Sequence, residues 1–230
     1  HPSPSRPRPL PAPRLVVLTR LRRSVKNLVE HGYTVRACVR DKTRTDKTAH
    51  LLAMDAPNSG TVDIVEADML VDGSYDDAFA GCSAVFHVAA DIGTDSSYGE
   101  IDPQRMYKGL FDATQNVLDS ITKAGTVQRL VYTSSCAAVM GPAPPGHEFT
   151  EDDWAGAGPY ETLEEKWKGG WTIEKNAYAV GKVECEKMTY RWGDENGVEV
   201  ITSCPNHVIG PLLAKAHDTI WQHRLGEIFC

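Results

Sequence analysis

The chain has 230 residues, 41% of them hydrophobic, which is enough to bury the core of one domain, or of one domain and part of another. Its formal charge of −7 at pH 7 argues against a nucleic-acid partner, because phosphate backbones attract basic surfaces. No apolar run approaches the roughly 20 residues that cross a bilayer, so we expect no membrane association.

The six cysteines indicate a reducing compartment. None belongs to a C-x-x-C pair or lies near a histidine at metal-ligand spacing, and several fall inside apolar, strand-like runs. We therefore expect buried thiols rather than disulfides, no metal site and a cytoplasmic protein.

Regular elements are expected after a Pro-, Arg- and Ser-rich start, residues 1–13, which has no initiator Met and which we expect to be a disordered extension. Apolar runs then alternate with amphipathic stretches of helical length. In chain order, the first half predicts a strand at 15–19, a helix at 24–31, a strand at 34–39, a helix at 48–54, a strand at 62–66, a helical turn at 75–79 and a strand at 84–88. The second half predicts a helix at 103–124, a strand at 129–134, a loop at 141–159, a helix at 176–196 and a strand at 199–204.

This alternation of strand and helix predicts parallel β-α-β units with right-handed crossovers. Strands that are apolar nearly throughout fit a sheet covered on both faces. We expect an α/β fold, a doubly wound Rossmann-like parallel sheet that forms a dinucleotide-binding domain over residues 14–211. Ligands of such sheets bind beyond the carboxyl ends of the strands, so functional residues should follow the strands.

Tyr178 and Lys182, in the run YAVGK, stand four residues apart on a predicted helix, so both project from one face. A free phenol has a pKa near 10. An ammonium beside it stabilises the phenolate and suits the pair to proton transfer, although a solvated helix face gives the same spacing. Ser134 and Ser135 follow the fifth predicted strand, which places a hydroxyl at the same sheet edge unless they serve only in a turn.

Seven segments occur in an order and at separations that resemble a known family. They are HGYTVRACVRD (31–41), EADML (66–70), GCSAVFHVAA (81–90), RLVYTSSCAAV (129–139), EDDW (151–154), YAVGK (178–182) and CPNHVIGP (204–211). They resemble the extended short-chain dehydrogenase/reductase (NAD-dependent epimerase/dehydratase) family, nearest to its branch of dihydroflavonol 4-reductase, cinnamoyl-CoA reductase and fungal aldehyde or ketone reductases. The resemblance spans residues 25–226, most of the chain.

The resemblance implies a catalytic set of Ser135, Tyr178 and Lys182, in which Tyr178 is the general acid of reduction and Lys182 lowers its pKa and binds the nicotinamide ribose. It implies further cofactor contacts from Asp68, Met69, Val88, Ala89, Ala90, Pro205, Asn206 and Val208. The function it implies is hydride transfer from NADPH to the carbonyl of a small-molecule aldehyde or ketone.

Arg40 bears on the choice of cofactor. NAD users commonly place an acid at the end of the second strand to bind the 2′-hydroxyl, whereas an arginine there suits the 2′-phosphate. Lys42, Arg44 and Lys47 follow closely, although a solvated basic stretch has the same composition. We expect NADP rather than NAD, with Arg40 and Lys47 among its ligands.

The sequence departs from the family between the first strand and the first helix. The family has a TGxxGFxG-type loop there, whose glycines let the backbone approach the pyrophosphate, but this chain has no glycine from residue 1 to residue 31. A fault in the gene model or a genuine loss of cofactor binding would explain this. Family members continue for about a hundred residues beyond the last motif, so we expect residues 212–230 to begin a largely missing substrate domain.

Two other functions stay open. An epimerase or dehydratase of a nucleotide sugar would use the same Tyr and Lys with NAD, and an inactive or truncated homologue would lack the glycine loop. His87 lies within a predicted buried strand, so we expect a core histidine with its hydrogen bonds satisfied rather than a catalytic group. Trp154, Trp167 and Trp171 are expected to pack rather than to line a substrate pocket.

Overall fold

The computed structural model describes residues 14–18, 22–54, 60–90, 102–141, 143, 145–156 and 171–206. The expected extension at 1–13, the cofactor contact of Val208, Trp167 and the region at 212–230 lie outside the described residues. Every strand and helix that the sequence predicts has a counterpart within the described part.

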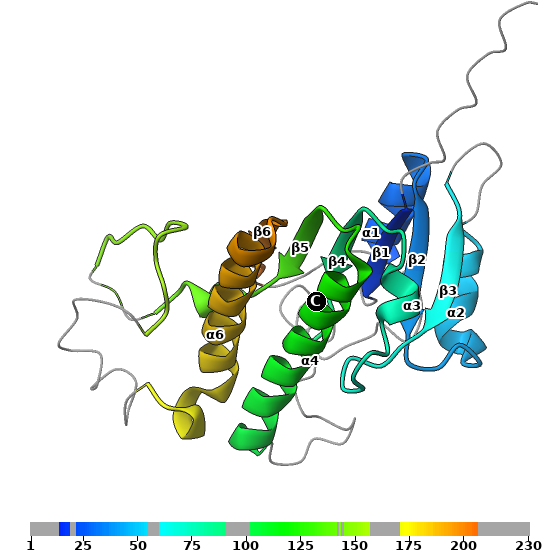
Figure 1. Cartoon of the computed structure of the whole chain (residues 1–230). Helices are drawn as coiled ribbons and strands as arrows, with labels where there is room; N and C mark the ends of the chain where they lie inside the picture. Colours follow the sequence, from blue (N-terminus) through cyan, green and yellow to red (C-terminus); the bar gives the residue numbers. More distant parts are fainter. Residues whose placement is uncertain are drawn as a thin grey trace, which may run out of the picture.

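The strands form one parallel sheet in the order β3-β2-β1-β4-β5-β6. Their bounds are β1 Arg14–Leu18, β2 Thr34–Val39, β3 Val62–Glu66, β4 Ala84–His87, β5 Arg129–Thr133 and β6 Glu199–Ser203. The strand order reverses between β1 and β4, which is the switch point at which doubly wound sheets bind ligands. The predicted Rossmann-like fold is confirmed (Figure 1).

The helices begin and end within three residues of their predicted bounds. They are α1 Arg22–Glu30, α2 Thr45–Leu52, α3 Asp76–Phe79, α4 Pro103–Ala124, the 3₁₀ turn η1 Cys136–Ala138 and α6 Ile173–Asn196. The bounds of α4 match because its ends are strongly marked: Asp102 accepts a hydrogen bond of 2.9 Å from the Gln104 amide, and Gly125 takes a left-handed φ of 62°.

Helix α6 begins three residues before its predicted start, which was about residue 176. A first turn from Ile173 joins the main helix across a kink at Asn176, whose φ of −138° and ψ of 33° are not helical. Asparagine tolerates such backbone angles, so the kink falls where the sequence pattern placed a boundary. The kink lies two residues before Tyr178, so Tyr178 stands in the first turn of the main helix.

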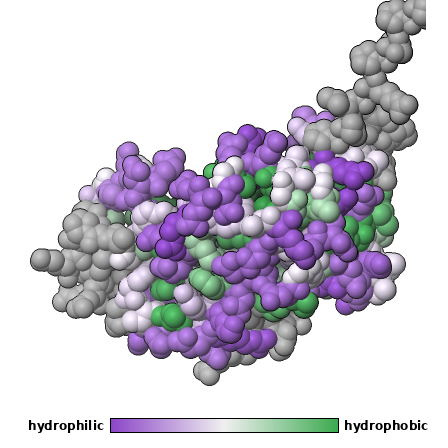
Figure 2. All heavy atoms as spheres, in the orientation of Figure 1, coloured by the Kyte–Doolittle hydropathy of each residue, from purple (hydrophilic) through white to green (hydrophobic). Residues whose placement is uncertain are grey.

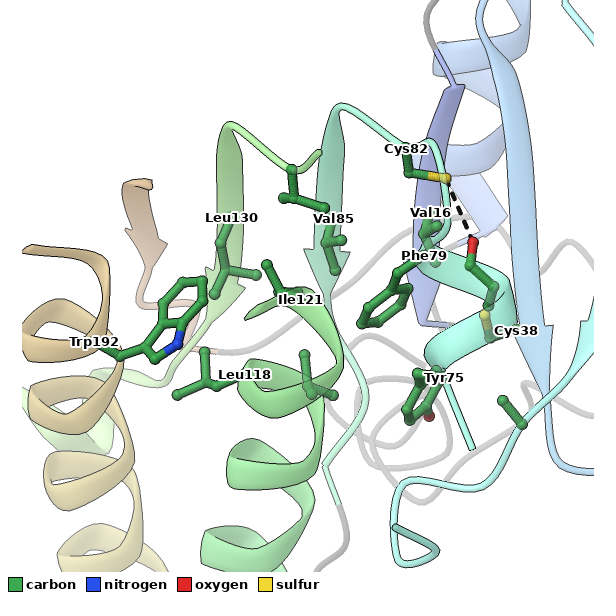
Figure 3. Packing of buried hydrophobic residues seen from close by; sticks show 14 residues of the cluster. Val16, Cys38, Tyr75, Phe79, Cys82, Val85, Leu118, Ile121, Leu130 and Trp192 are labelled. Atoms are coloured by element: carbon green, nitrogen blue, oxygen red, sulfur yellow. Dashed lines mark hydrogen bonds between the residues drawn. The ribbon is translucent and has the colours of Figure 1, made fainter. Parts of the chain in front are cut away.

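The larger core lies between the sheet and a layer made by α3, α4 and α6. Its buried side chains include Val16, Phe79, Val85, Leu118, Ile121, Leu130 and Trp192. Figure 3 shows Trp192 reaching from α6 towards Leu118 and Ile121 of α4. Burying each of these side chains contributes roughly 1.5–3 kcal/mol, and the Trp192 indole also donates a 2.9 Å hydrogen bond to the Thr122 hydroxyl. The packing fixes α4 and α6 side by side.

A smaller core covers the opposite face of the sheet under α1 and α2. It contains Val25, Val29, Val35, Ala37, Leu51 and Val62. Along β2, Val35 and Ala37 enter this core while Cys38 enters the larger one, as expected where successive side chains alternate between faces. Both faces of the sheet are therefore covered, which explains its apolar strands.

The face that carries α4 and α6 presents mainly hydrophilic side chains, with scattered apolar ones (Figure 2). Within the described ranges, no helix combines the length and the apolarity needed to cross a membrane. The five cysteines of those ranges form no disulfide, as predicted; Cys230 lies outside them.

Candidate active site

Ser135 lies at the carboxyl edge of the sheet, two residues beyond β5. The Ser134 amide continues the strand pairing with a 2.8 Å hydrogen bond to the Ser203 carbonyl, and the Cys136 amide donates to the Pro205 carbonyl at 3.0 Å. These bonds join the segment after β5 to the segment after β6. The Ser135 hydroxyl accepts a 3.2 Å bond from the Ala137 amide, so its own hydrogen remains available to another acceptor.

Tyr178 and Lys182 stand one turn apart on α6, but their environments differ. Tyr178 is 36% exposed, whereas Lys182 is only 3% exposed. The Lys182 ammonium donates a 3.1 Å hydrogen bond to the backbone carbonyl of Thr133, the last residue of β5. This bond ties α6 to the strand end two residues before Ser135, so the structure brings the three predicted catalytic residues to one edge of the sheet.

Lys182 is buried beside the Tyr132 ring, with Glu186 one turn further along α6. Its burial lowers the pKa of the ammonium. The ammonium lies 5.4 Å from the centre of the Tyr132 ring, where the electron-rich face of the ring attracts it. One of its three N–H donors is bonded to Thr133, and the others suit the hydroxyls of a nicotinamide ribose. The described residues thus fit the nicotinamide end of a dinucleotide.

His87 is buried, as predicted, with its ring 5.3 Å from that of Tyr132. Burial, and secondarily the Lys182 charge, lowers the pKa of His87 from 6.5 to about 3, so the ring is neutral at pH 7. The expectation that all its hydrogen bonds are satisfied is wrong for one atom: Nδ1 has no partner among the described residues. The physical reason is that His87 lies wholly inside the sheet core, with the Tyr132 ring packed against its imidazole.

Five of the predicted cofactor contacts follow the ends of β3 and β4. Val88, Ala89 and Ala90 come directly after β4 and are half-buried. Asp68 and Met69 follow β3, and the Asn116 side chain of α4 donates a 2.9 Å hydrogen bond to the Met69 carbonyl. That bond fixes the backbone of the loop after β3 against α4.

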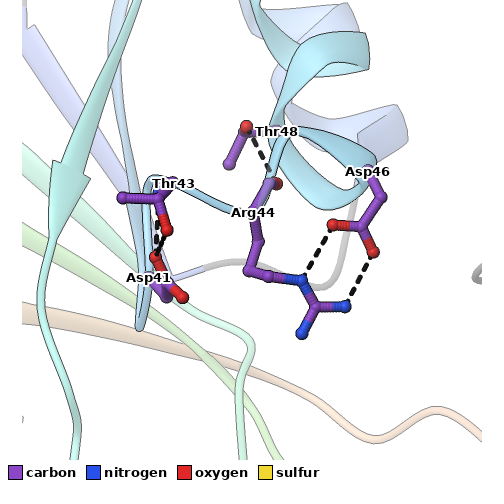
Figure 4. A network of polar contacts seen from close by, with 5 residues as sticks. All are labelled: Asp41, Thr43, Arg44, Asp46 and Thr48. Carbon is purple, nitrogen blue, oxygen red and sulfur yellow. Dashed lines mark hydrogen bonds and ion pairs between the residues drawn. The ribbon is translucent and has the colours of Figure 1, made fainter.

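The basic stretch after β2 is partly neutralised within itself (Figure 4). Arg44 makes two hydrogen bonds, of 2.9 and 2.8 Å, to the Asp46 carboxylate. The Asp41 carboxylate accepts bonds from the Thr43 amide and hydroxyl at 2.8 and 2.5 Å, and these bonds lower its pKa. Arg40 is exposed at the end of β2.

The remaining predicted cofactor residues are placed only in part. Lys47 belongs to α2, Pro205 and Asn206 follow β6, and Val208 lies outside the described residues. So do residues 19–21, which join β1 to α1 at the position where the family has its glycine loop.

Two residues near the site are not singled out by the sequence pattern. Asn116 belongs to the inward face of α4, and Glu186 stands one turn after Lys182 on α6, with 5% exposure. The four-residue spacing places Glu186 on the same helix face as Lys182 and could have marked it as a neighbour, but glutamates at that spacing from a lysine are common on solvated helices.

The model of the NAD dependent epimerase/dehydratase family matches residues 22–226. The chain belongs to this family. A family relative, the bifunctional dihydroflavonol 4-reductase/flavanone 4-reductase of Malus domestica, is 36% identical over 191 residues, covering 82% of this chain and 51% of the relative. The anthocyanidin reductase of Arabidopsis thaliana is 32% identical over 189 residues, covering 81% of this chain and 52% of that protein. The chain therefore spans about half the length of the curated relatives it matches.

Solved structures of the family share the fold. Vestitone reductase from alfalfa, at 25% identity, superposes with a TM-score of 0.62 over 88% of this chain and 59% of its own. Gre2 from Candida albicans, solved in complex with NADPH, superposes with a TM-score of 0.67 at 23% identity, covering 90% of this chain and 61% of its own. The second likeness concerns the fold alone.

Proposed function

We propose that the protein is an NADP-dependent reductase of a small-molecule aldehyde or ketone. The observation that carries the proposal is the buried Lys182 ammonium, one helical turn from Tyr178. It is bonded to the carbonyl of Thr133, which lies two residues before Ser135. A cation held there stabilises a phenolate, which is what proton transfer by a tyrosine requires. The names of the relatives, which are reductases, support the same reaction class.

Each side chain has a defined task in this mechanism. NADPH, when bound, supplies the hydride that reduces the carbonyl carbon. The Ser135 hydroxyl, whose oxygen already accepts from Ala137, donates to the substrate carbonyl oxygen and orients it. Tyr178, whose side chain reaches solvent, gives its phenolic proton to that oxygen, and Lys182 stabilises the phenolate left behind.

The proposal assigns NADP rather than NAD because of the end of β2. Arg40 is exposed there, while Asp41, the next residue, has one carboxylate oxygen engaged by Thr43. A guanidinium with its donors available suits a 2′-phosphate. Lys47 is proposed as a further ligand of the phosphate, Asp68 and Met69 as the adenine contacts, and Val88, Ala89, Ala90, Pro205, Asn206 and Val208 as contacts along the rest of the cofactor.

Residues 14–211 are proposed to form the cofactor domain, and a substrate-binding region to begin at 212. A cytoplasmic location is part of the proposal, and the absence of disulfides among the five described cysteines supports it.

The test is the rate of NADPH oxidation by the full-length protein with a panel of aliphatic and aromatic aldehydes and ketones that includes a dihydroflavonol. Tyr178→Phe is expected to lower kcat at least about 100-fold, because it removes the transferable proton. Tyr33→Phe, in the smaller core on the opposite face, is the matched control and keeps the wild-type rate. A Tyr178→Phe variant as fast as wild type overturns the mechanism.

Equilibrium binding separates the proposal from the two other functions. An NADP-dependent reductase binds NADPH more tightly than NADH, whereas a nucleotide-sugar epimerase or dehydratase would prefer NAD(H). Binding of neither cofactor would identify an inactive homologue.

A further inference from the structure

Glu186 is a buried carboxylate that the proposed mechanism does not use. It is 5% exposed on α6, one turn beyond Lys182. Its Oε1 accepts a 3.0 Å hydrogen bond from the Thr202 hydroxyl on β6, and its Oε2 accepts from the Cys204 thiol at 3.7 Å. The Tyr190 hydroxyl lies 2.8 Å from Thr202 Oγ1; because that hydroxyl gives its hydrogen to Glu186, Tyr190 is the donor. Burial of a carboxylate is costly, and these donors offset the cost.

Lys182 and Glu186 face the same part of the sheet. Lys182 is bonded to Thr133 at the end of β5, and Glu186 is bonded to Thr202 of β6. In the sheet, Thr202 pairs with Tyr132, the residue directly before Thr133. Two opposite charges are therefore buried one helical turn apart under the same strand ends. At the low effective dielectric of such a site their attraction persists without direct contact.

The other titratable groups that face Lys182 are neutral at physiological pH. His87 of β4 has a pKa of about 3, and burial keeps the pKa of the Tyr132 phenol on β5 well above its usual value. Burial likewise raises the pKa of the Cys185 thiol on α6 and of the Cys204 thiol beyond β6. Tyr178, the proposed proton donor, lies one turn before Lys182 on the same helix. Glu186 is thus the counter-charge of Lys182 among these described neighbours.

We propose that Glu186 is a positioning residue that keeps the Lys182 ammonium charged by attraction across one helical turn. Thr202 and Cys204 engage the carboxylate oxygens, so Glu186 supplies its charge while the N–H donors of Lys182 stay available to a ligand. The inference deepens the proposed reductase function, because Lys182 acts on Tyr178 only in its charged form.

The direct test is an NMR titration of the lysine side chains in full-length protein carrying ¹³C-labelled lysine, without cofactor or substrate. Lys182→Arg assigns the signal. Glu186→Gln keeps the side-chain size and the acceptor oxygen for Thr202. In this variant the titration midpoint of the Lys182 signal is expected to fall by at least about one pH unit. Glu184→Gln, two residues away on α6, is the matched control and leaves the midpoint in place. An equal midpoint in Glu186→Gln and wild type overturns the inference.

Two further variants separate charge from packing. Glu186→Asp keeps the charge and is expected to titrate within a few tenths of a unit of wild type; a fall as large as that of Glu186→Gln would refute a role of the charge. Thr202→Val removes a donor to the carboxylate and leaves Glu186 to turn towards Lys182, so the Lys182 midpoint rises. A fall in that variant overturns the inference even if Glu186→Gln does not fold.

The pH profile of reduction gives a second readout. The alkaline limb of kcat/KM for Glu186→Gln is expected to move to lower pH by the same amount as the NMR midpoint, because Lys182 loses its proton earlier. An unmoved limb contradicts the inference. The two proposals fail separately: an inactive wild-type protein refutes the reductase function, whereas the titration of Lys182 needs no activity.

Discussion

The buried ring of His87 predicts a specific loss of stability in mild acid. Its pKa falls from 6.5 to about 3 on folding, because burial penalises the imidazolium. Below pH 6.5 the unfolded chain binds a proton at this ring and the folded chain does not, so stability falls as the pH falls. Between the two pKa values, each pH unit lowers the free energy of unfolding by about 1.4 kcal/mol. Between pH 6.5 and about pH 5 the loss is about 2 kcal/mol, and by pH 3 it reaches roughly 4–5 kcal/mol.

Substitution His87→Leu isolates this effect. The leucine side chain has a similar volume, and the ring nitrogen Nδ1 that it removes has no hydrogen-bond partner among the described residues, so the change at about pH 7.5 is expected to be within about 1.5 kcal/mol. Urea unfolding at about pH 7.5 and about pH 5 measures both proteins. The pH-dependent loss is expected to be about 2 kcal/mol smaller in His87→Leu.

The window is chosen because the carboxyl groups with lowered pKa, such as Asp76 and Asp153, lose their contribution only below their unfolded values near 3.8. A parallel loss of stability in wild type and His87→Leu between these two pH values would refute the argument from burial.

Two further substitutions test the fold and the cofactor edge. Gly60→Ala is expected to destabilise the protein by about 3 kcal/mol or more, because the added Cβ would lie 1.8 Å from the Tyr33 carbonyl oxygen. In the control Gly141→Ala the nearest contact of the added Cβ is 3.7 Å, so the thermal unfolding temperature should change little. Equal changes of the unfolding temperature in the two variants would contradict this. Asn116→Ala removes the hydrogen bond that fixes the Met69 carbonyl, so steady-state kinetics should show KM for NADPH raised several-fold with kcat unchanged, and a fall in kcat alone would count against it.

The fold was predictable because its signals are local. The ends of α4 are marked by Asp102 and Gly125, whose side chain and backbone freedom satisfy the terminal groups of the helix whatever packs around it. The strands alternate with helices of sufficient length for parallel crossovers, and the observed strand order follows. The first turn of α6 was missed because Asn176, at its kink, is also a typical residue for a helix boundary.

The sequence predicted where the residues of the candidate site lie, but not how buried they are or which groups they contact. Motif spacing placed Ser135, Tyr178 and Lys182 on elements that meet at one edge of the sheet. It gave no indication that Lys182 would be 3% exposed and bonded to a backbone carbonyl, because that bond joins residues 49 positions apart. The partner of Met69 is likewise 47 residues away, on α4. Contacts of this separation depend on how helices pack, which periodicity does not encode.

The charges beneath the strand ends are linked through one group. The Lys182 ammonium contributes to keeping His87 neutral, and the Glu186 carboxylate acts on Lys182 in the opposite direction. In the arrangement proposed above, a buried cation with a counter-charge one turn away, rather than in direct contact, stays charged and keeps donors for a ligand. A direct ion pair would satisfy the burial of both groups equally well but would occupy those donors. On this proposal, the hydrogen bond of Thr202 to Glu186 holds the carboxylate on β6 and leaves the Lys182 donors to a ligand.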